Sequence, residues 1–422
     1  MQGALLAGTH SGCGKTTIML ALLQYFQHSK HSISAFKAGP DFLDPLWHQA
    51  VIGKASYNLD TRMLGKEACR LQLLTQAKSA EIALIEGVMG LFDGIADVGG
   101  EGSSVDLAYV LGCPVILVVD AGGMSGSIAA VVSGFVQFAL ENKVSISGII
   151  ANKVGSAYHA ELLKAALQDY NLPPLIAWME RNKETLTERH LGLTMPESKA
   201  IPDYLAFFHV DHTALIVAFT SIKTDQSVPL QELPRFKGRT VAIARDDACC
   251  FIYPANLDWL QSNGAELVFF SPIAGDPIPE SADALWLPGG YPELHAQELS
   301  QSKTWQSLKE FINANKPVLA ECGGAMLLGE AIMDIKGEKW PMAAILPFIS
   351  VMQPLLVSLG HRTDKSGVRG HEFHYSKRES TLEFTPAFEL DRGDCGIRYK
   401  NVRASYIHWY FASASDQTAD WF

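Results

Sequence analysis

A glycine-rich segment near the N-terminus constrains the fold of this chain more than any other feature. Residues 4–7 are a short apolar run, residues 8–14 are rich in glycine, and residues 15–27 have the pattern of a helix. A strand that passes through a short turn directly into a helix is typical of strand–helix–strand units, in which the strands pair in parallel. The segment therefore predicts an α/β fold built on a parallel sheet.

The same segment has residues of the kind that bind nucleotide phosphates. Backbone N–H groups of such a loop, together with the start of the helix, form a nest for phosphate oxygens. A lysine at this point reaches the β- and γ-phosphates, and the hydroxyl that follows it binds Mg²⁺. The usual pattern has glycine at position 9, where this chain has threonine, so a glycine-rich turn without a ligand is the alternative. The predicted nucleotide-binding residues are Gly12, Gly14, Lys15, Thr16 and Thr17.

Short apolar runs alternate with helical patterns in both halves of the chain. Nearly continuous runs of Ile, Leu, Val and Ala are typical of strands covered on both faces. A polar stretch with two prolines interrupts the alternation, which begins again at residue 240. We therefore expect two α/β domains, residues 1–224 and 238–422, joined by a linker at residues 225–237. In the first half the expected strands are 82–85, 115–119 and 146–151, and the expected helices are 126–140 and 157–169.

The composition argues against several classes of protein. Lys and Arg number 34 against 45 Asp and Glu, so the formal net charge is -11. Nucleic acids and anionic membranes bind basic surfaces, so neither is an expected partner. The chain has no run of about 18 uniformly apolar residues and no basic N-terminal region, which argues against a membrane span and a signal peptide. The seven cysteines include no C-x-x-C pair, so we expect a cytoplasmic protein without a disulfide or zinc framework.

Four acidic residues follow apolar runs, where a parallel sheet would bring them to one edge. Glu86 ends the run 82–85, Asp93 lies shortly after it, and Asp41 and Asp44 follow a candidate second strand. Any one of them could instead be a solvated loop residue or a helix cap. Carboxylates gathered at one sheet edge beside a phosphate loop would suit Mg²⁺ and substrate binding.

Asn152 indicates which nucleotide the chain uses. It follows the apolar run 146–151 and precedes a lysine, as in the N-K-x-D element that reads guanine in GTPases. Position 155 is glycine, so the carboxylate that would bind the guanine edge is missing. ATP is therefore the expected nucleotide, with Asn152 among its contacts.

A second chemical motif surrounds Cys322. The sequence around it predicts a strand, a sharp turn and a helix, with the cysteine at the turn and glycines after it. We expect the helix N-terminus to lower the pKa of the thiol, because the thiolate is the reactive form. His408 is the best-placed base by sequence, and Gly289, Gly290 and Gly323 could supply N–H groups for an oxyanion. The other six cysteines are interpreted as small buried hydrophobic residues.

His371 and His374 are spaced like a pair of metal ligands. Beyond Glu372, however, the neighbouring sequence has no acidic or cysteine partner. We therefore interpret residues 370–375 as a substrate-contacting or structural loop rather than a metal site.

Several segments, taken in order, resemble the glutamine-dependent cobyrinic acid a,c-diamide synthases of cobalamin biosynthesis over essentially the whole chain. The N-terminal loop and residues 39–41, 58–60 and 86–90 resemble the dethiobiotin-synthetase-like ATP domain of that family. Residues 287–294, the Cys322 turn and residues 370–375 resemble its class I glutamine amidotransferase domain, which has a flavodoxin-like fold. Several such segments in the right order are far more specific than any single one.

The resemblance implies a ligase that uses ATP, Mg²⁺ and glutamine. Cys322 would attack the side-chain amide of glutamine, and His408 would raise the nucleophilicity of the thiol. Class I amidotransferases usually have glutamate two residues after this histidine, and here the position is Tyr410. The remaining implied roles are ATP and Mg²⁺ binding for Lys15 and Thr16, further metal contacts for Asp41 and Glu86, and contact with the reacting carboxylate for Asp44 and Asp93.

The implied reaction activates the a and c acetate carboxylates by phosphoryl transfer and converts them to amides with ammonia from glutamine. Close alternatives are cobyric acid synthase and the hydrogenobyrinic acid or nickel-sirohydrochlorin a,c-diamide synthases, which would keep the same catalytic residues. A P-loop ATPase switch is an alternative from another class, but it leaves Cys322 and His408 without a function. A catalytically inactive structural protein is a third alternative, and both of these predict no glutaminase activity. Small-molecule substrates are the expected partners, and a homo-oligomer is left open.

Overall fold

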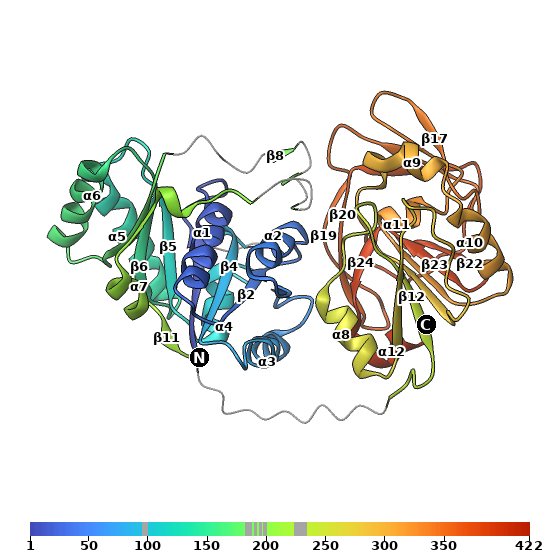
Figure 1. Cartoon of the computed structure of the whole chain (residues 1–422), viewed down its shortest axis with the longest axis horizontal. Coiled ribbons are helices and arrows are strands. Elements are labelled where there is room, and N and C mark those ends of the chain that lie inside the picture. The colour runs from blue at the N-terminus through green and yellow to red at the C-terminus, as the bar shows by residue number, and fades with distance from the viewer. Residues whose placement is uncertain (95–99, 182–187, 190–191, 194–195, 197–200, 223–233) are drawn as a thin grey trace. The chain divides into compact units, whose positions relative to one another are not determined.

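The computed structural model describes residues 1–94, 100–181, 188–189, 192–193, 196, 201–222 and 234–422 (Figure 1). The chain divides into two compact units, Met1–Val228 and Pro229–Phe422. Residues 225–233 of the expected linker lie outside the described residues, and residues 235–238 form a turn.

The first unit contains one large sheet among its described residues. Its strands are β1 Gln2–Gly8, β2 Ile33–Ala38, β3 Tyr57–Leu59, β4 Ile82–Gly90, β5 Val115–Asp120, β6 Ile146–Val154, β7 Leu175–Glu180, β10 Phe208–Val210 and β11 Thr220–Ser221. Their order is β10-β7-β6-β5-β1-β4-β2-β3, and β11 pairs with β1. The seven strands from β1 to β7 pair in parallel, whereas β10 and β11 are antiparallel to their neighbours. The predicted parallel sheet is therefore confirmed.

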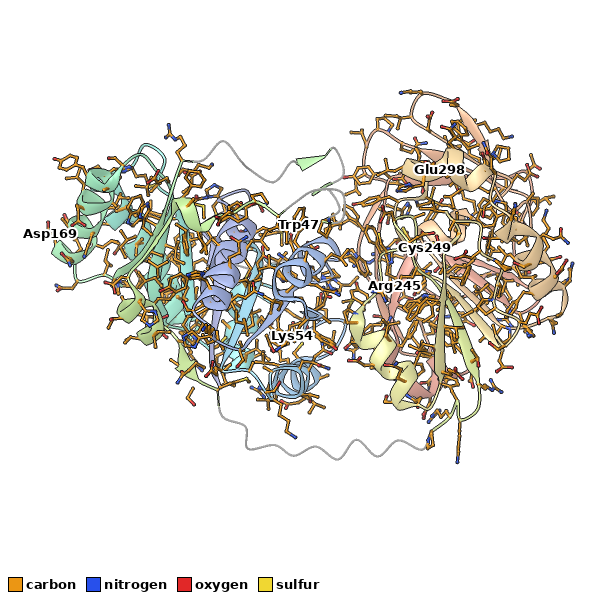
Figure 2. The ribbon with its side chains drawn as sticks, in the orientation of Figure 1. Trp47, Lys54, Asp169, Arg245, Cys249 and Glu298 are labelled. Carbon is orange, nitrogen blue, oxygen red and sulfur yellow. The ribbon has the colours of Figure 1, made fainter. Side chains whose placement is uncertain are left out.

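Helices connect these strands. They are α1 Lys15–His28, α2 Leu43–Ile52, α3 Lys66–Gln76, α4 Ser104–Leu111, α5 Ser127–Glu141, α6 Ala157–Asp169 and α7 His212–Val217, with the 3₁₀ turn η2 Leu205–Phe207 and a short hairpin of β8 Glu188–Arg189 and β9 Gly192–Leu193. Helix α1 contacts α2, α3 contacts α4, and α5 contacts α6. Trp47 of α2 is buried in a core cluster with α1, whereas Lys54 and Asp169 are exposed (Figure 2). Burial of each large apolar side chain of this kind contributes about 1.5–3 kcal/mol.

The second unit contains a second α/β sheet and two smaller sheets. The six-stranded sheet has the order β13-β12-β14-β15-β23-β22 within the described residues, with β12 Thr240–Ala244, β13 Glu266–Phe270, β14 Ala284–Leu287, β15 Val318–Glu321, β22 Ile397–Tyr399 and β23 Val402–Ser405. The helices are α8 Pro254–Ser262, α9 Ala296–Ser300, α10 Thr304–Asn313, α11 Gly323–Met326 and α12 Ser415–Ala419, with 3₁₀ turns η3 Pro292–His295 and η4 Phe411–Ala414.

The two smaller sheets have the orders β17-β16-β18-β21 and β19-β20-β24. Their strands are β16 Ala331–Met333, β17 Lys339–Pro341, β18 Ile349–Met352, β19 Ser358–Thr363, β20 Arg369–His374, β21 Ser376–Glu379 and β24 Ile407–Tyr410. The interpretation of residues 370–375 as a loop is therefore wrong, because most of this segment is strand β20. It pairs with β19 and β24, so its backbone polar groups are used in a ladder.

A search of the described residues for a helix with the length and apolar character of a membrane span finds none.

Candidate active sites

The phosphate loop joins β1 to α1 in a conformation that depends on glycine. Gly12 and Gly14 have φ angles of 79° and 96°, in the left-handed region that residues with a Cβ rarely adopt. Gly14 is the N-cap of α1. A Cβ built on Gly14 would lie 2.0 Å from Nδ2 of Asn152, which donates a hydrogen bond to the carbonyl of Cys13 at 2.9 Å. The predicted Asn152 thus lies against the loop from β6.

Lys15 begins α1 and is buried, with its Nζ 3.4 Å from the carbonyl oxygen of His10 in the same loop. Burial lowers the pKa of Lys15, because it removes water from the charged ammonium. An anion bound in the loop would restore the lost charge stabilisation. This position suits the phosphate contact that the sequence predicts.

Thr16 and Glu86 come together as neighbours, although 70 residues separate them. The Thr16 hydroxyl donates to Oε1 of Glu86 at 2.7 Å, because β4 pairs with β1 and places Glu86 at the level of the loop. Glu86 also accepts a hydrogen bond from Nε2 of His48 at 2.8 Å. Burial alone would raise the pKa of Glu86, but Lys37, His48 and Thr16 outweigh it and lower this pKa to about 2.

Lys37 of β2 is a residue of this site that the sequence analysis did not single out. Its Nζ lies 2.5 Å from Oδ2 of Asp44 and 3.2 Å from Oε1 of Glu86, and all three residues are buried. Burial favours a neutral amine, but the two carboxylates outweigh it and raise the pKa of Lys37, so the ammonium stays charged. A lysine in the mostly apolar segment 33–38 was the available sequence signal.

The other predicted acids take more local roles in this structure. Oδ1 of Asp41 accepts the N–H groups of Leu43 and Asp44 at the start of α2, at 2.8 and 3.0 Å. Asp93 is exposed, and its Oδ2 accepts the N–H of Gly90 at 2.8 Å. Asp44 is engaged with Lys37, and burial together with Asp41 and Glu86 raises the pKa of Asp44. Asp44 and Glu86 therefore meet at Lys37, while Asp41 and Asp93 also stabilise turns.

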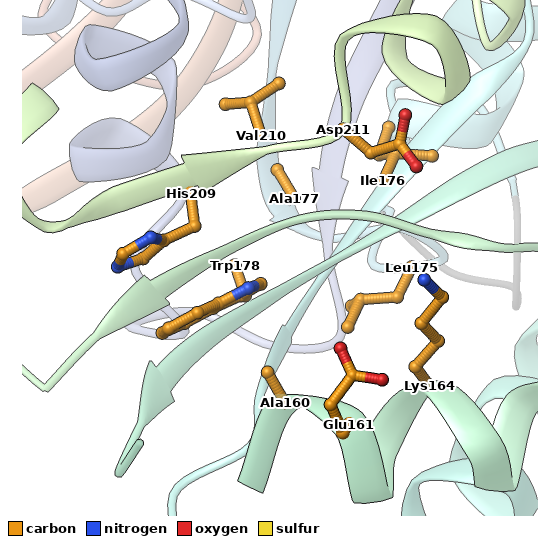
Figure 3. Close-up of a pocket in the computed structure, with 10 residues that line it drawn as sticks. All are labelled: Ala160, Glu161, Lys164, Leu175, Ile176, Ala177, Trp178, His209, Val210 and Asp211. Atoms are coloured by element: carbon orange, nitrogen blue, oxygen red, sulfur yellow. The ribbon is translucent and has the colours of Figure 1, made fainter. Parts of the chain in front are cut away.

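A cavity of about 260 Å³ lies elsewhere in the first unit, between α6 and the strands β7 and β10 (Figure 3). Trp178 and His209 stack beside it with ring centroids 3.8 Å apart. None of the predicted site residues lines this cavity. The cavity is therefore separate from the residues that the sequence predicts for nucleotide binding.

Cys322 occupies a sharp turn between β15 and α11. Its φ and ψ angles are 46° and -112°, a conformation that costs a residue with a Cβ about 1–3 kcal/mol and is maintained by the surrounding structure. Its N–H donates to the carbonyl of Ser405 at 2.7 Å, and its Sγ lies 3.9 Å from the carbonyl oxygen of Phe373. The predicted strand and turn are confirmed, but the helix that follows spans only Gly323–Met326.

The expectation of a lowered thiol pKa is wrong. Burial raises the pKa of Cys322, and the nearby carboxylate of Glu293 adds to the effect. A single helical turn is too short to outweigh the loss of water around a thiolate. In the resting site the sulfur is therefore a neutral thiol.

His408 faces Cys322 across Gly289. A Cβ built on Gly289 would lie 2.2 Å from Cε1 of His408 and 3.1 Å from Cβ of Cys322, so only glycine fits between them. A Cβ built on Gly323 would lie 3.1 Å from the backbone nitrogen of Gly290. The structure therefore brings together all five residues that the sequence predicts for this site. Burial, with a smaller effect of His371, lowers the pKa of His408 to about 3.

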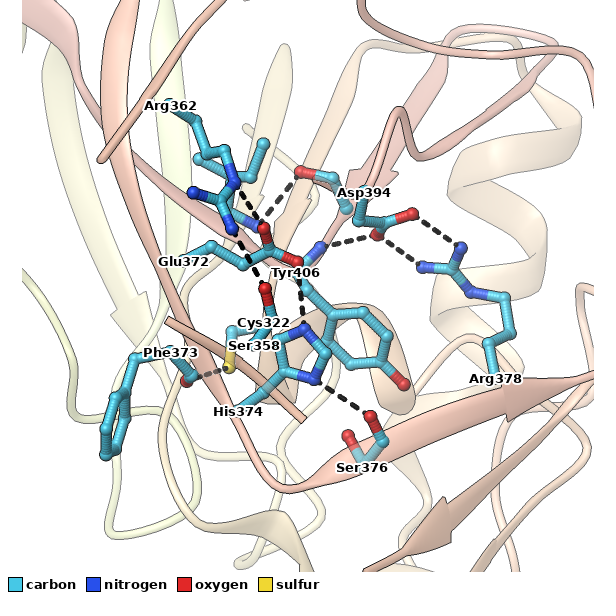
Figure 4. A network of polar contacts seen from close by, with 12 residues as sticks. Cys322, Ser358, Arg362, Glu372, Phe373, His374, Ser376, Arg378, Asp394 and Tyr406 are labelled. Carbon is cyan, nitrogen blue, oxygen red and sulfur yellow. Dashed lines mark hydrogen bonds and ion pairs between the residues drawn. The ribbon is translucent and has the colours of Figure 1, made fainter. Parts of the chain in front are cut away.

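Charged and polar side chains of β20 and its neighbours form a network beside Cys322 (Figure 4). Glu372 accepts from Nε of Arg362 at 2.6 Å and contacts Nε2 of His374 at 2.9 Å, and Nδ1 of His374 contacts the carbonyl of Ser376 at 2.8 Å. His374 stacks on Tyr406 with centroids 4.0 Å apart. Both ring nitrogens of His374 are thus engaged with protein groups. His371 instead pairs with His408 across β20 and β24.

Comparison with known proteins places each unit in a family. A model of the CobQ/CobB/MinD/ParA nucleotide binding domain matches residues 4–202, and a model of the CobB/CobQ-like glutamine amidotransferase domain matches residues 240–416. These matches confirm the predicted order of a nucleotide-binding α/β unit followed by an amidotransferase unit. They also show that the first unit belongs to a class that binds nucleotides.

Similar proteins extend over nearly the full chain. Cobyrinate a,c-diamide synthase of Herminiimonas arsenicoxydans is 38% identical, covering 98% of this chain and 95% of that protein. The protein of the same name from Priestia megaterium is 35% identical over 99% and 95%. Hydrogenobyrinate a,c-diamide synthase of Brucella anthropi is 36% identical over 97% and 98%. The chain therefore belongs to the family of cobyrinate a,c-diamide synthases.

Proposed function

We propose that this protein amidates the a and c acetate carboxylates of cobyrinic acid, using ATP and ammonia released from glutamine. One observation carries the proposal: a single chain combines a phosphate loop with a cysteine that faces a histidine across Gly289. A carboxylate at neutral pH resists nucleophiles and must be activated by phosphoryl transfer. Ammonia must be released from an amide, which suits a cysteine nucleophile.

Release of ammonia begins with the thiol of Cys322 and the imidazole of His408 both uncharged. Because the pKa of His408 is lowered to about 3, its imidazole is free of charge at neutral pH and can accept the thiol proton as sulfur attacks the amide carbon of glutamine. The imidazolium then returns this proton to the departing nitrogen, ammonia leaves, and water hydrolyses the thioester. The N–H groups of Gly290 and Gly323 are proposed to bind the oxyanion, since these glycines pack together beside Cys322.

Activation of the substrate takes place at the phosphate loop. A carboxylate oxygen attacks the γ-phosphorus, ADP leaves, and ammonia then attacks the acyl phosphate and displaces phosphate. Lys15 and the N–H groups of the loop are proposed to bind the phosphates and offset their charge. Asp44 and Asp93 are proposed to lie toward the reacting carboxylate, and Lys37 offsets the negative charge of Asp44.

Mg²⁺ is proposed to bind the hydroxyl of Thr16 and the carboxylate of Glu86, with Asp41 as a further contact. The two side chains fit this ion, because they place hard oxygen atoms 2.7 Å apart beside the phosphate loop. Among the described residues, no group of three or more His, Cys, Asp or Glu side chains is arranged to hold a metal, so phosphates and water would complete the shell. When bound, the ion neutralises charge on the transferred phosphoryl group.

No disulfide joins any of the seven cysteines, all of which lie among the described residues, and this supports our proposal of a cytoplasmic enzyme acting on small molecules. The deciding experiment is mass spectrometry of cobyrinic acid incubated with the protein, ATP, Mg²⁺ and glutamine. We expect the monoamide and then the diamide, and neither product when ATP is omitted. Cys322→Ala should abolish product formation from glutamine and preserve it from ammonium, whereas the matched Cys395→Ala should preserve both. Normal use of glutamine by Cys322→Ala would contradict the assigned nucleophile.

Hydrogenobyrinic acid is the second candidate substrate, because the Brucella anthropi relative of that name is 36% identical to this chain. The same assay with cobyrinic and hydrogenobyrinic acid in competition separates the two. The preferred corrinoid is the one whose diamide forms first at equal concentrations. If neither is converted while glutamine is hydrolysed, the amidotransferase proposal stands and the corrinoid substrate is wrong.

A further inference from the structure

Glu321 is a buried carboxylate that the reaction described above does not use. It is the last residue of β15, directly before Cys322, and is 1% exposed. Its Oε2 accepts the indole N–H of Trp286 at 2.9 Å, and its Oε1 accepts the backbone N–H of Trp409 at 2.8 Å. Burial raises the pKa of Glu321 to about 8, although both N–H donors oppose this shift. A buried carboxyl group costs free energy unless its oxygens are hydrogen-bonded, so a position that keeps one needs a reason.

The two donors belong to the segments that carry the other parts of the amidotransferase site. Trp286 lies in β14, three residues before Gly289. Trp409 lies in β24 and directly follows His408. One side chain on the strand of the nucleophile therefore contacts both the strand of the base and the strand that leads to the proposed oxyanion glycines.

Strand pairing shows why such a link matters. Strand β15 pairs with β14 and β23 in the six-stranded sheet. Strand β24 pairs with β20 in a different, three-stranded sheet. The ladder of the large sheet therefore fixes Gly289 relative to Cys322 but does not include His408. The hydrogen bond from Trp409 to Glu321 crosses from one sheet to the other next to the base.

We propose that Glu321 is a positioning residue of the amidotransferase site, which holds the strand of His408 and the strand before Gly289 in register with Cys322. This inference rests on the proposed use of glutamine. It accounts for the alignment of His408 in a chain that has Tyr410 where class I amidotransferases usually have glutamate. Glu321 acts through the backbone of its neighbours and not through contact with glutamine.

Only a carboxyl group, with two oxygens that accept hydrogen bonds, suits both donors at once. Glutamine at this position has a single acceptor oxygen, so its amide N–H₂ would face either the indole N–H of Trp286 or the backbone N–H of Trp409. Glu321→Gln should therefore break one of the two hydrogen bonds while preserving volume. Trp286→Phe removes the indole donor. In the double variant the glutamine oxygen can therefore accept from the N–H of Trp409, and its N–H₂ group no longer faces another N–H donor.

The test measures glutaminase kinetics and ammonium-dependent amidation for Glu321→Gln, Trp286→Phe and the double variant. We expect Glu321→Gln to lower glutaminase kcat roughly tenfold to a hundredfold, with a much smaller change in KM for glutamine. Trp286→Phe should lower kcat less, and the double variant should regain part of the activity lost in Glu321→Gln. Amidation from ammonium should stay within about twofold of the wild type in all three.

Two results would overturn the inference. One is a folded Glu321→Gln protein with wild-type glutaminase kcat. The other is a double variant whose loss is the product of the two single losses, because the carboxylate would then not act through these donors. If Glu321→Gln does not fold, the glutaminase kcat of Trp286→Phe becomes the test. An unchanged kcat in that variant rejects the positioning role of Glu321. Absence of glutaminase activity in the wild type would instead reject the proposed function.

Discussion

Lys15 and Lys37 lie in one site but differ in their charged neighbours. Lys15 lies in the phosphate loop, where burial lowers its pKa. Lys37 lies between Asp44 and Glu86, which raise its pKa against the effect of burial. Burial of the Lys15 ammonium costs the folded protein free energy, and loss of Lys15 removes this cost. Loss of Lys37 leaves two buried carboxylates without their cation.

The two lysines should therefore separate activity from stability. Lys15→Met should abolish amidation from either nitrogen source without lowering the unfolding midpoint of the first unit. Lys37→Met should abolish amidation and also destabilise this unit by about 3–5 kcal/mol, the usual cost of breaking a buried ion pair. ADP release and denaturant unfolding measure the two effects, with the exposed Lys54→Met as control. Equal stability of Lys37→Met and wild type would show that the ion pairs contribute little.

The raised pKa of Cys322 predicts slow alkylation at neutral pH. Iodoacetamide reacts with the thiolate, and a raised pKa means that less thiolate is present at a given pH than in a free thiol. The alkylation rate should be well below that of glutathione at pH 7 and should still rise above about pH 9, past the ordinary thiol range. Peptide mass spectrometry follows Cys322 separately from the other cysteines. Faster alkylation than glutathione at pH 6–7 would reveal a preformed thiolate.

At the scale of elements, the amidotransferase site depends on how closely β14 approaches β24. Gly289 follows β14, and any side chain there would enter the space between His408 and Cys322. Gly289→Ala should therefore abolish glutaminase activity and preserve amidation from ammonium. Gly134→Ala is the control, because a Cβ at this position of α5 meets no atom within 4 Å and alanine favours helix. Retained glutaminase activity in Gly289→Ala would mean that the two strands separate readily.

The sequence predicts those elements whose signal is local. The strand, phosphate loop and helix at residues 4–27 follow from an apolar run, glycines and a helical pattern, and β1 and α1 confirm them. The contact of Lys37 with Glu86 depends on β2 lying next to β4, which is not its neighbour in sequence. The pKa of Cys322 depends on burial by β20, some 50 residues away. The small sheets around β20 also lack long apolar runs, so their strands could not be predicted.

At the scale of the whole molecule, each unit has its own hydrophobic core. One cluster includes α1, α2 and the centre of the first sheet, and two others lie within the second unit. Substitutions in one site should therefore leave the fold of the other unit intact. For this reason we expect ammonium to replace glutamine as the nitrogen source in variants of Cys322, Gly289 or Glu321.

We nevertheless expect the two reactions to be coupled in the intact chain. Ammonia released into water at neutral pH takes up a proton and loses its nucleophilic lone pair, so the chemistry favours direct use of each molecule released at Cys322. We expect [amide-¹⁵N]glutamine to label both new amides of the product, with little dilution when unlabelled ammonium is present at equal concentration. Mass spectrometry of the diamide measures the label. Cys322→Ala in the same mixture should give only unlabelled product. A wild-type product whose label is diluted to the isotopic composition of the solution would show that ammonia leaves the protein before it reacts. In that case amidation should fall as the pH is lowered, because less unprotonated ammonia remains in solution.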